Sequence, residues 1–214
     1  MSVENELKKI FCDPHAETID GVLVVGGKLT TDLLVCAYEQ GIFPWPHEGY
    51  PMLWFCPDER GVIEFSELHI PRSFQKWLNK NEQRYNISMN KRFAEVLANC
   101  KTQVRAGQTG TWITREIEKT YNQLFQMGHA FSLEVEKDGK LVGGIYGVQS
   151  QKYFSCESMF HLEDNVSKFA LLSLIRQLQA NGNSWVDIQM VTSVCASFGG
   201  KLIAKKEFLK KIGI

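Results

Sequence analysis

The 214-residue sequence lacks several features that mark large classes of protein. Its apolar runs fall far short of the ~20 residues that a membrane-spanning helix needs, so we expect no membrane association. The charged opening MSVENELKK has no apolar centre of the kind found in secretory signal peptides, which favours a cytoplasmic location. The six cysteines form no C-x-x-C pair and no metal-like spacing, so we expect reduced thiols and no bound metal.

An excess of charge of either sign is also missing, because 24 basic residues balance 24 acidic ones. A neutral chain argues against binding nucleic acid over its whole surface, although it permits a local basic patch. The composition, 44% hydrophobic and 22% charged, is that of an ordinary globular protein. The length suits one sizeable domain with a smaller appendage, or two small domains.

Residues 1–62 are expected to form a small N-terminal domain. Thr30 and Gly41 are placed to cap and to end a short helix. The next segment, IFPWPHEGYPMLWFCPDERG, holds four of the six prolines together with Trp45 and Trp54. Proline restricts the backbone to turns and extended segments, so both indole rings should be held rigidly. We expect Trp54 to be a packing residue.

Residues 63–214 are expected to form an α+β domain. Hydrophobic periodicity and cap residues predict the following order: a strand at 60–65, a helix at 72–84, a strand at 85–89, helices capped by Asn90 and Thr114, three strands between 130 and 160, a buried helix capped by Asn165, and a strand at 184–190. This is the order of the acetyltransferase-type (GNAT) fold, in which helices flank a mixed sheet. Fold alone does not establish function.

One face of the helix at 72–84 is basic. Arg72, Lys76 and Lys80 recur at i, i+4 and i+8, and Arg84 continues the series, interrupted only by Glu82. Such a face is often merely solvated, but a stripe of one sign in a neutral protein also suits a phosphate backbone.

Three polar residues stand out in otherwise apolar strands. Glu157 would be costly to bury unless it is paired or used. Asp187 and Gln189 should project from the same face of their strand, because side chains alternate with period two. A site at the end of this strand is one interpretation, and a hydrogen-bonded structural pair is the other.

Several short stretches together resemble the leucyl/phenylalanyl-tRNA–protein transferase family. They are GGKL, AYEQGIFPW, LWFCPD, GTWIT, GHAFSLEV, LVGGIYGV, ESMF, NVSKFALL and DIQ, and their order and spacing carry the resemblance along nearly the whole chain. It implies an enzyme that moves Leu, Phe or Met from the 3' acceptor end of aminoacyl-tRNA onto proteins with N-terminal Arg or Lys, which marks them for proteolysis. No cofactor is implied.

The resemblance also implies roles for particular residues. Trp45 and Trp112 would hold the terminal adenosine, and the face formed by Arg72, Lys76, Lys80 and Arg84 would contact the tRNA backbone. Asp187 and Gln189 would be the catalytic centre, with Glu157 beside them. From its charge, we expect Glu157 to bind the cationic N-terminal residue of the acceptor. The pocket for the aminoacyl side chain would be formed by Ile145, Phe154, Cys156, Leu171 and Leu174. Without the resemblance, all five pocket residues would be interpreted as core.

Chemistry limits the mechanism that such a centre needs. The donor ester is already activated, and an α-amine of pKa about 7.7–8.0 is partly neutral at pH 7, so no covalent enzyme nucleophile is required. An amide is a poor base. We therefore expect Gln189 to orient the amine through its carbonyl, with Asp187 polarising that amide or removing the proton. Alignment of the two substrates should supply most of the rate.

Two alternatives to this function stay open, and one of them arises because the chain departs from the family pattern. Cys156 stands where relatives commonly have Gly, and Thr192 and Val194 stand where they often have Asn and His. A relative that binds RNA but has weakened catalysis is therefore one alternative. An acyl-CoA N-acyltransferase is the other, although FHLEDNVSK lacks the glycines that cradle a pyrophosphate. The glycines of VGGIYG are expected to permit close approach of a substrate backbone.

Overall fold

The computed structural model describes residues 13–103 and 111–214. The opening segment and Gly110, the first residue of GTWIT, lie outside these ranges. The strands are β1 (Val22–Val25), β2 (Phe43–Pro44), β3 (Leu53–Phe55), β4 (Glu59–Glu64), β5 (Asn86–Met89), β6 (Ala130–Lys137), β7 (Lys140–Gln149), β8 (Phe154–His161), β9 (Trp185–Gln189) and β10 (Lys201–Ala204). The α-helices are α2 (Thr31–Glu39), α3 (Arg72–Asn81), α4 (Phe93–Thr102), α5 (Arg115–Gln126), α6 (Val166–Ala180), α7 (Ser193–Ser197) and α8 (Lys205–Lys211), with 3₁₀ turns η1 (Phe65–Glu67) and η2 (Glu82–Arg84).

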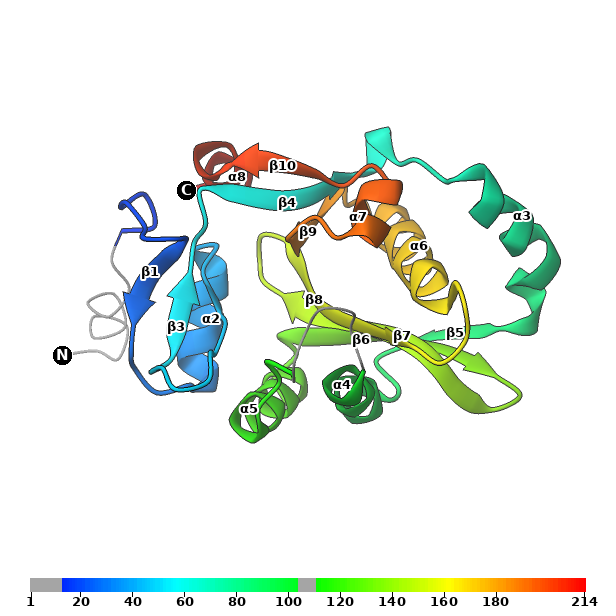
Figure 1. Cartoon of the computed structure of the whole chain (residues 1–214), viewed down its shortest axis with the longest axis horizontal. Helices are drawn as coiled ribbons and strands as arrows, with labels where there is room; N and C mark the ends of the chain where they lie inside the picture. Colours follow the sequence, from blue (N-terminus) through cyan, green and yellow to red (C-terminus); the bar gives the residue numbers. More distant parts are fainter. Residues whose placement is uncertain (1–12, 104–110) are drawn as a thin grey trace.

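The strands form two sheets (Figure 1). The smaller sheet has the order β1-β3-β2, and the larger has the order β10-β4-β9-β8-β7-β6-β5. All neighbours in the larger sheet are antiparallel except β8 and β9, which α6 connects as a crossover. The predicted α+β class, with a mixed sheet, flanking helices and the predicted order of elements, is confirmed.

Helices cover both faces of the larger sheet, α4 and α5 on one and α6 on the other (Figure 1). Alternation along β7 assigns side chains to the two cores: Ile145 belongs to the core under α6, and Tyr146 to the core shared with α4, α5 and α2. The small sheet therefore packs into the second core, beside one face of the large sheet.

The predicted domain boundary at residue 62/63 falls within β4, which belongs to the larger sheet. The C-terminal helix α8 packs against the end of α2, where a Cβ placed on Gly41 would lie 2.8 Å from the Phe208 ring. The division at 62/63 stays a prediction.

Two of the predicted helix caps are confirmed, and two differ. The hydroxyls of Thr30 and Thr114 accept hydrogen bonds from the backbone N–H groups of the first helical turn. The prediction for Asn90 is wrong: α4 begins at Phe93, and the Asn90 amide oxygen instead accepts from the Ser132 backbone at 2.9 Å. Asn165 does precede α6, but it adopts a left-handed φ of 67° and makes no side-chain cap.

The glycines of β7 leave space that is filled by neighbouring side chains and backbone of the protein itself. A Cβ on Gly147 would lie 2.1 Å from the carbonyl oxygen of Ser155, and one on Gly143 would lie 2.3 Å from Val166. These contacts are too short for any larger residue. They explain the glycines by packing within the protein, in place of the expected approach of a substrate backbone.

Candidate functional site

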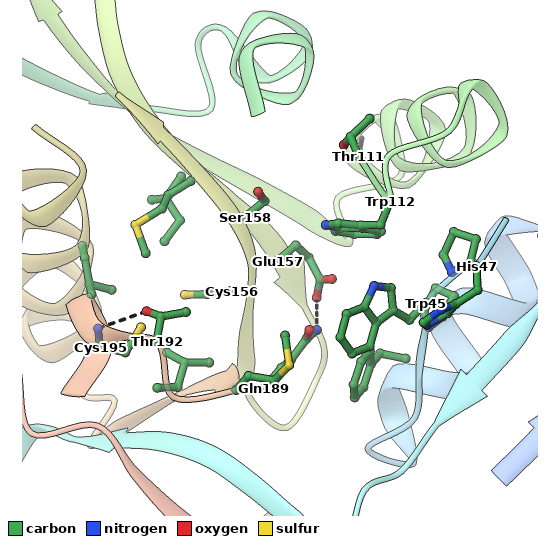
Figure 2. Close-up of a pocket in the computed structure, with 18 of the residues that line it drawn as sticks. Trp45, His47, Thr111, Trp112, Cys156, Glu157, Ser158, Gln189, Thr192 and Cys195 are labelled. Carbon is green, nitrogen blue, oxygen red and sulfur yellow. Dashed lines mark hydrogen bonds between the residues drawn. The ribbon is translucent and has the colours of Figure 1, made fainter. Parts of the chain in front are cut away.

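A cavity of about 580 Å³ lies between the proline-rich segment after α2 and the β8–β9 region of the large sheet (Figure 2). Its walls come from segments that are distant in the sequence. The lining residues are Phe43, Pro44, Trp45, Pro46, His47, Glu48, Thr111, Trp112, Ile145, Cys156, Glu157, Ser158, Met159, Leu171, Ile188, Gln189, Met190, Thr192 and Cys195.

Both tryptophans predicted to bind the adenosine line this cavity. Trp45 is half-buried, is held at its backbone by Leu53, and packs against the Phe55 ring with centroids 5.4 Å apart. Trp112 is also half-buried and packs edge-on against Tyr121. Trp54, in contrast, is fully buried, as expected for a packing residue. Each lining indole thus has one side supported by protein and part of its surface open.

The five residues predicted to form the aminoacyl pocket separate into two groups. Ile145, Cys156 and Leu171 line the cavity. Phe154 and Leu174 lie outside it: Phe154 packs edge-on against Phe131, and Leu174 is fully buried in the core under α6. Alternation along a strand and periodicity along a helix both place neighbouring apolar residues in the same core, so the sequence could not separate cavity from core here.

Asp187 is fully buried and forms an ion pair with the equally buried Arg60 of β4. Nε and Nη2 of Arg60 donate to the two carboxylate oxygens, at 2.9 and 2.7 Å. The guanidinium also lies 4.4 and 4.7 Å from the ring centroids of Phe43 and Phe208. Burial disfavours the charge of Arg60, but the attraction of Asp187 outweighs it and raises the pKa of the guanidinium.

Gln189 is aimed into the cavity, with a backbone φ of 57°. Its backbone N–H donates to Oδ1 of Asp187 at 2.9 Å, and its side-chain Nε2 donates to Oε1 of Glu157 at 2.8 Å. Asp187 therefore contacts the backbone of Gln189, while its link to the Gln189 amide passes through Ser155, which bonds both groups. Period-two alternation along β9 implies a direct contact between the Asp187 carboxylate and the Gln189 side-chain amide. In the structure the Ser155 hydroxyl lies between these two groups instead.

Glu157 lies between the Gln189 amide and the Trp112 indole (Figure 2). Its Oε2 atom is buried and has no hydrogen-bond partner within residues 13–103 and 111–214. Burial raises the pKa of the Glu157 carboxyl to about 7, while the Tyr38 phenol and the Gln189 amide act in the opposite direction. A carboxyl of this pKa exists in both protonation states near neutral pH.

Four polar residues of the site were not predicted from the sequence: Arg60, Ser155, His47 and Glu48. A signal existed for Ser155, because it precedes Glu157 by two residues and so shares its face of β8. Arg60 gave no comparable signal, since an arginine at the start of a strand usually faces solvent. His47 and Glu48 follow Trp45 on the proline-rich segment, where no periodicity shows which side chains face inward.

The predicted basic face is exposed but does not belong to the cavity. Arg72, Lys76, Lys80 and Arg84 are all exposed on α3 and η2, at the opposite end of the molecule from the small sheet (Figure 1). Glu82, the one acidic residue in the series, pairs with Arg176 of α6 at 2.6 Å. The positive charge of Arg176 thus balances the negative charge of Glu82, which interrupts the basic face.

Comparison with known families decides the assignment. The model of the leucyl/phenylalanyl-tRNA protein transferases matches residues 62–213, and that of the N-terminal domain of the same family matches residues 27–58. The chain belongs to this family. The resemblance inferred from the short motifs is confirmed, and with it the expectation of an aminoacyltransferase.

Curated leucyl/phenylalanyl-tRNA–protein transferases align over most of the chain. A relative from Flavobacterium psychrophilum is 41% identical over 200 residues, which are 94% of each protein. One from Pseudomonas fluorescens is 44% identical over 189 residues, which are 88% of this chain and 82% of the relative.

Solved structures give weaker similarity. L-PGS from Bacillus licheniformis aligns with a TM-score of 0.45 and 10% identity over 80% of this chain and 57% of that one. A GCN5-related N-acetyltransferase from Kribbella flavida aligns with a TM-score of 0.42 and 8% identity over 79% and 59% of the two chains. The family assignment rests on the sequence comparisons alone.

The turn before α6 differs from a pyrophosphate cradle. Glu163 lies just before the helix and bonds Lys137 at 2.8 Å and the Tyr85 hydroxyl at 2.8 Å. A carboxylate at this position repels a phosphate that would bind the helix N-terminus. The acyl-CoA alternative is therefore disfavoured by local charge as well as by family. Within the described ranges, no helix is long and apolar enough to cross a membrane, and no group of acidic, His and Cys side chains could hold a metal ion.

The raised pKa of Glu157 predicts a pH-dependent stability. The folded protein binds this proton more tightly than the unfolded chain, whose carboxyl has an ordinary pKa of 4.5, so stability is lost as pH rises from about 4.5 through 7. Glu157→Gln, which carries no charge at any pH, should therefore be more stable than the parent at pH 8, by roughly 1–3 kcal/mol. At pH 4.5 this advantage should vanish.

Urea unfolding of both proteins at the two pH values measures this difference. Glu116→Gln is the matched control, because Glu116 is exposed on α5 and should show no such gain at pH 8. A Glu157→Gln variant whose stability relative to the parent is the same at both pH values would contradict the raised pKa.

Proposed function

We propose that the protein transfers Leu, and also Phe or Met, from aminoacyl-tRNA to the N-terminal α-amine of proteins that begin with Arg or Lys, so that they are marked for N-degron proteolysis in the cytoplasm. The observation that carries the proposal is the cavity itself, in which Trp45 and Trp112 face the same space as Gln189 and Glu157. A base-binding platform and a polar centre are thus within reach of one small ester.

Within the cavity we assign the terminal adenosine to the two indole rings. Stacking on an aromatic face is worth about 1–3 kcal/mol per base and does not depend on base sequence. This suits an enzyme that recognises the common end of all tRNAs. The aminoacyl side chain is assigned to the apolar wall of Ile145, Cys156 and Leu171.

We assign the reaction centre to Gln189, supported by Asp187. The Gln189 Nε2 atom donates to Glu157, which leaves the amide carbonyl oxygen as the acceptor for the N–H of an incoming amine. Such a contact orients the nitrogen lone pair towards the ester carbon. The ester is already activated, so this alignment supplies most of the rate.

The cationic N-terminal residue of the acceptor is assigned to the acidic side of the cavity. Glu157 lies beside the reaction centre, and Glu48 lies on the proline-rich segment near the opening. The raised pKa of Glu157 makes its attraction for a cation partial at neutral pH and stronger above it. Acceptors with N-terminal Arg or Lys should therefore be used better as pH rises through 7.

Transfer of radiolabelled Leu from charged tRNA to a peptide beginning with Arg tests the proposed function. We expect Leu–Arg peptide to accumulate, with less product from a matched peptide beginning with Glu, because the acidic cavity repels it. Acetylation of labelled peptide from acetyl-CoA would identify an acyl-CoA enzyme. Binding of charged tRNA without product would identify an RNA-binding relative that has lost catalysis.

Trp112→Ala should weaken binding of an aminoacyl-adenosine mimic by about 1–3 kcal/mol through loss of stacking. Direct calorimetric titration measures this loss, and an unchanged thermal midpoint shows that the fold is intact. Trp77→Phe is the control, since Trp77 packs against the α6 core and lies outside the cavity. Equal affinity of parent and Trp112→Ala would mean that Trp112 is only a packing residue.

Replacing Lys76 and Lys80 by Gln should weaken tRNA binding and reduce the slope of log affinity against log salt by about one unit per lost phosphate contact. The Leu-to-Phe preference should not change, because α3 lies outside the cavity. Lys119→Gln, an exposed substitution on α5, is the control. A salt slope equal to that of the parent would show that the basic face is only solvated.

A further inference from the structure

The carboxylate of Asp187 has all of its hydrogen-bonding capacity in use. Oδ1 accepts from Arg60 Nε and from the Gln189 backbone N–H, each at 2.9 Å. Oδ2 accepts from Arg60 Nη2 at 2.7 Å and from the Ser155 hydroxyl at 2.9 Å. A carboxylate offers about four lone-pair sites, so these four bonds fill it. The side chain is also fully buried and does not line the cavity.

The backbone of Gln189 is held in a conformation that needs support. Its φ of 57° lies in the left-handed region, and the Met190 N–H donates to the Ile188 carbonyl at 2.5 Å, which closes a three-residue turn centred on Gln189. Turns of this kind with positive φ at the centre are rare and strained. The hydrogen bond from the Gln189 backbone N–H to Oδ1 of the buried Asp187 is the contact that holds this turn in place.

Arg60 joins this turn to the opposite wall of the cavity. Its Nη1 donates to the Gly41 carbonyl at 3.3 Å, and its guanidinium lies against the Phe43 ring. Gly41 and Phe43 lie four and two residues before Trp45 in the chain. One buried cation therefore contacts both the segment that carries the indole ring and the carboxylate that holds Gln189.

We propose that Arg60 and Asp187 are positioning residues that work as a pair: they hold Gln189 in its strained turn, with its amide directed into the cavity, and Asp187 takes no proton from the acceptor amine. The inference rests on the proposed aminoacyl transfer and assigns the role of each residue within it. The ammonium proton is released to solvent before attack. The amine nitrogen then bonds to the ester carbon, the ribose oxygen leaves, and that oxygen receives the second proton.

Two double variants in which positions 60 and 187 are both uncharged test the positioning role; they are called the pair with Asn and the pair with Ala, after the residue at position 187. Arg60→Met with Asp187→Asn removes both charges, while the Asn carbonyl oxygen can still accept from the Gln189 N–H. Arg60→Met with Asp187→Ala removes the same charges and that acceptor as well. We expect the pair with Asn to retain kcat within about tenfold of the parent, because neutral replacement of a buried ion pair is often tolerated. The pair with Ala should lose kcat much more, with a KM for tRNA equal to that of the pair with Asn, because both pairs lack the same Arg60 contacts to Gly41 and Phe43.

The single variant Asp187→Asn should be less active than the pair with Asn, because it leaves the Arg60 charge buried without its partner. This recovery on removing a second residue would not occur if Asp187 accepted the proton. In that case the loss of about 10²–10⁴-fold that accompanies removal of a general base would persist in both neutral pairs. Equal, high activity of both pairs would instead show that Gln189 does not need the bond to residue 187.

Amide hydrogen exchange of Gln189 provides a readout that does not need activity. Exchange should be slow in the parent and in the pair with Asn, and fast in the pair with Ala; equal exchange in the two pairs would overturn the proposal. If Arg60→Met prevents folding, Arg60→Gln replaces it in both pairs. A parent that transfers no Leu would refute the proposed function, while the exchange rates would still decide whether Asp187 holds the turn.

Discussion

The buried ion pair between Arg60 and Asp187 is the constraint on which the arrangement of the cavity depends. It joins β4 to β9, and through Gly41 and Phe43 it reaches the proline-rich segment that forms the facing wall. Burying two charges costs free energy that their attraction only partly returns, so such a pair is weak support for stability. Its contribution is geometric, because a bidentate guanidinium fixes both distance and direction.

The polar groups around this pair become less buried and less fully hydrogen-bonded from the core towards the cavity. Asp187 is saturated with hydrogen bonds and closed to solvent, while Ser155 bonds both Asp187 and Glu157. Glu157 is next to the open space, with one oxygen unpaired among the described residues and a pKa raised to about 7. The buried ion pair thus orients the neutral or partly charged groups that line the cavity.

Much of the local structure was predictable, because it depends on residues close in sequence. The Thr30 and Thr114 caps and the buried helix α6 follow from side chains within one or two helical turns. Asn90 shows the limit of such reasoning: its amide bonds Ser132, which is 42 residues away, and a cap signal cannot compete with a partner that only the sheet provides. Phe154 and Leu174 show the same limit for apolar residues.

The sequence by itself determined the family, the α+β class and two polar residues of the cavity, Glu157 and Gln189, since these depend on motif order and on periodicity along the chain. The tertiary structure alone decided what those residues do to one another. Arg60 and Asp187 are 127 positions apart, and burial, not residue type, sets the pKa of Glu157. Packing brings distant segments together and removes water from between them, and neither effect can be predicted from a short stretch of the sequence.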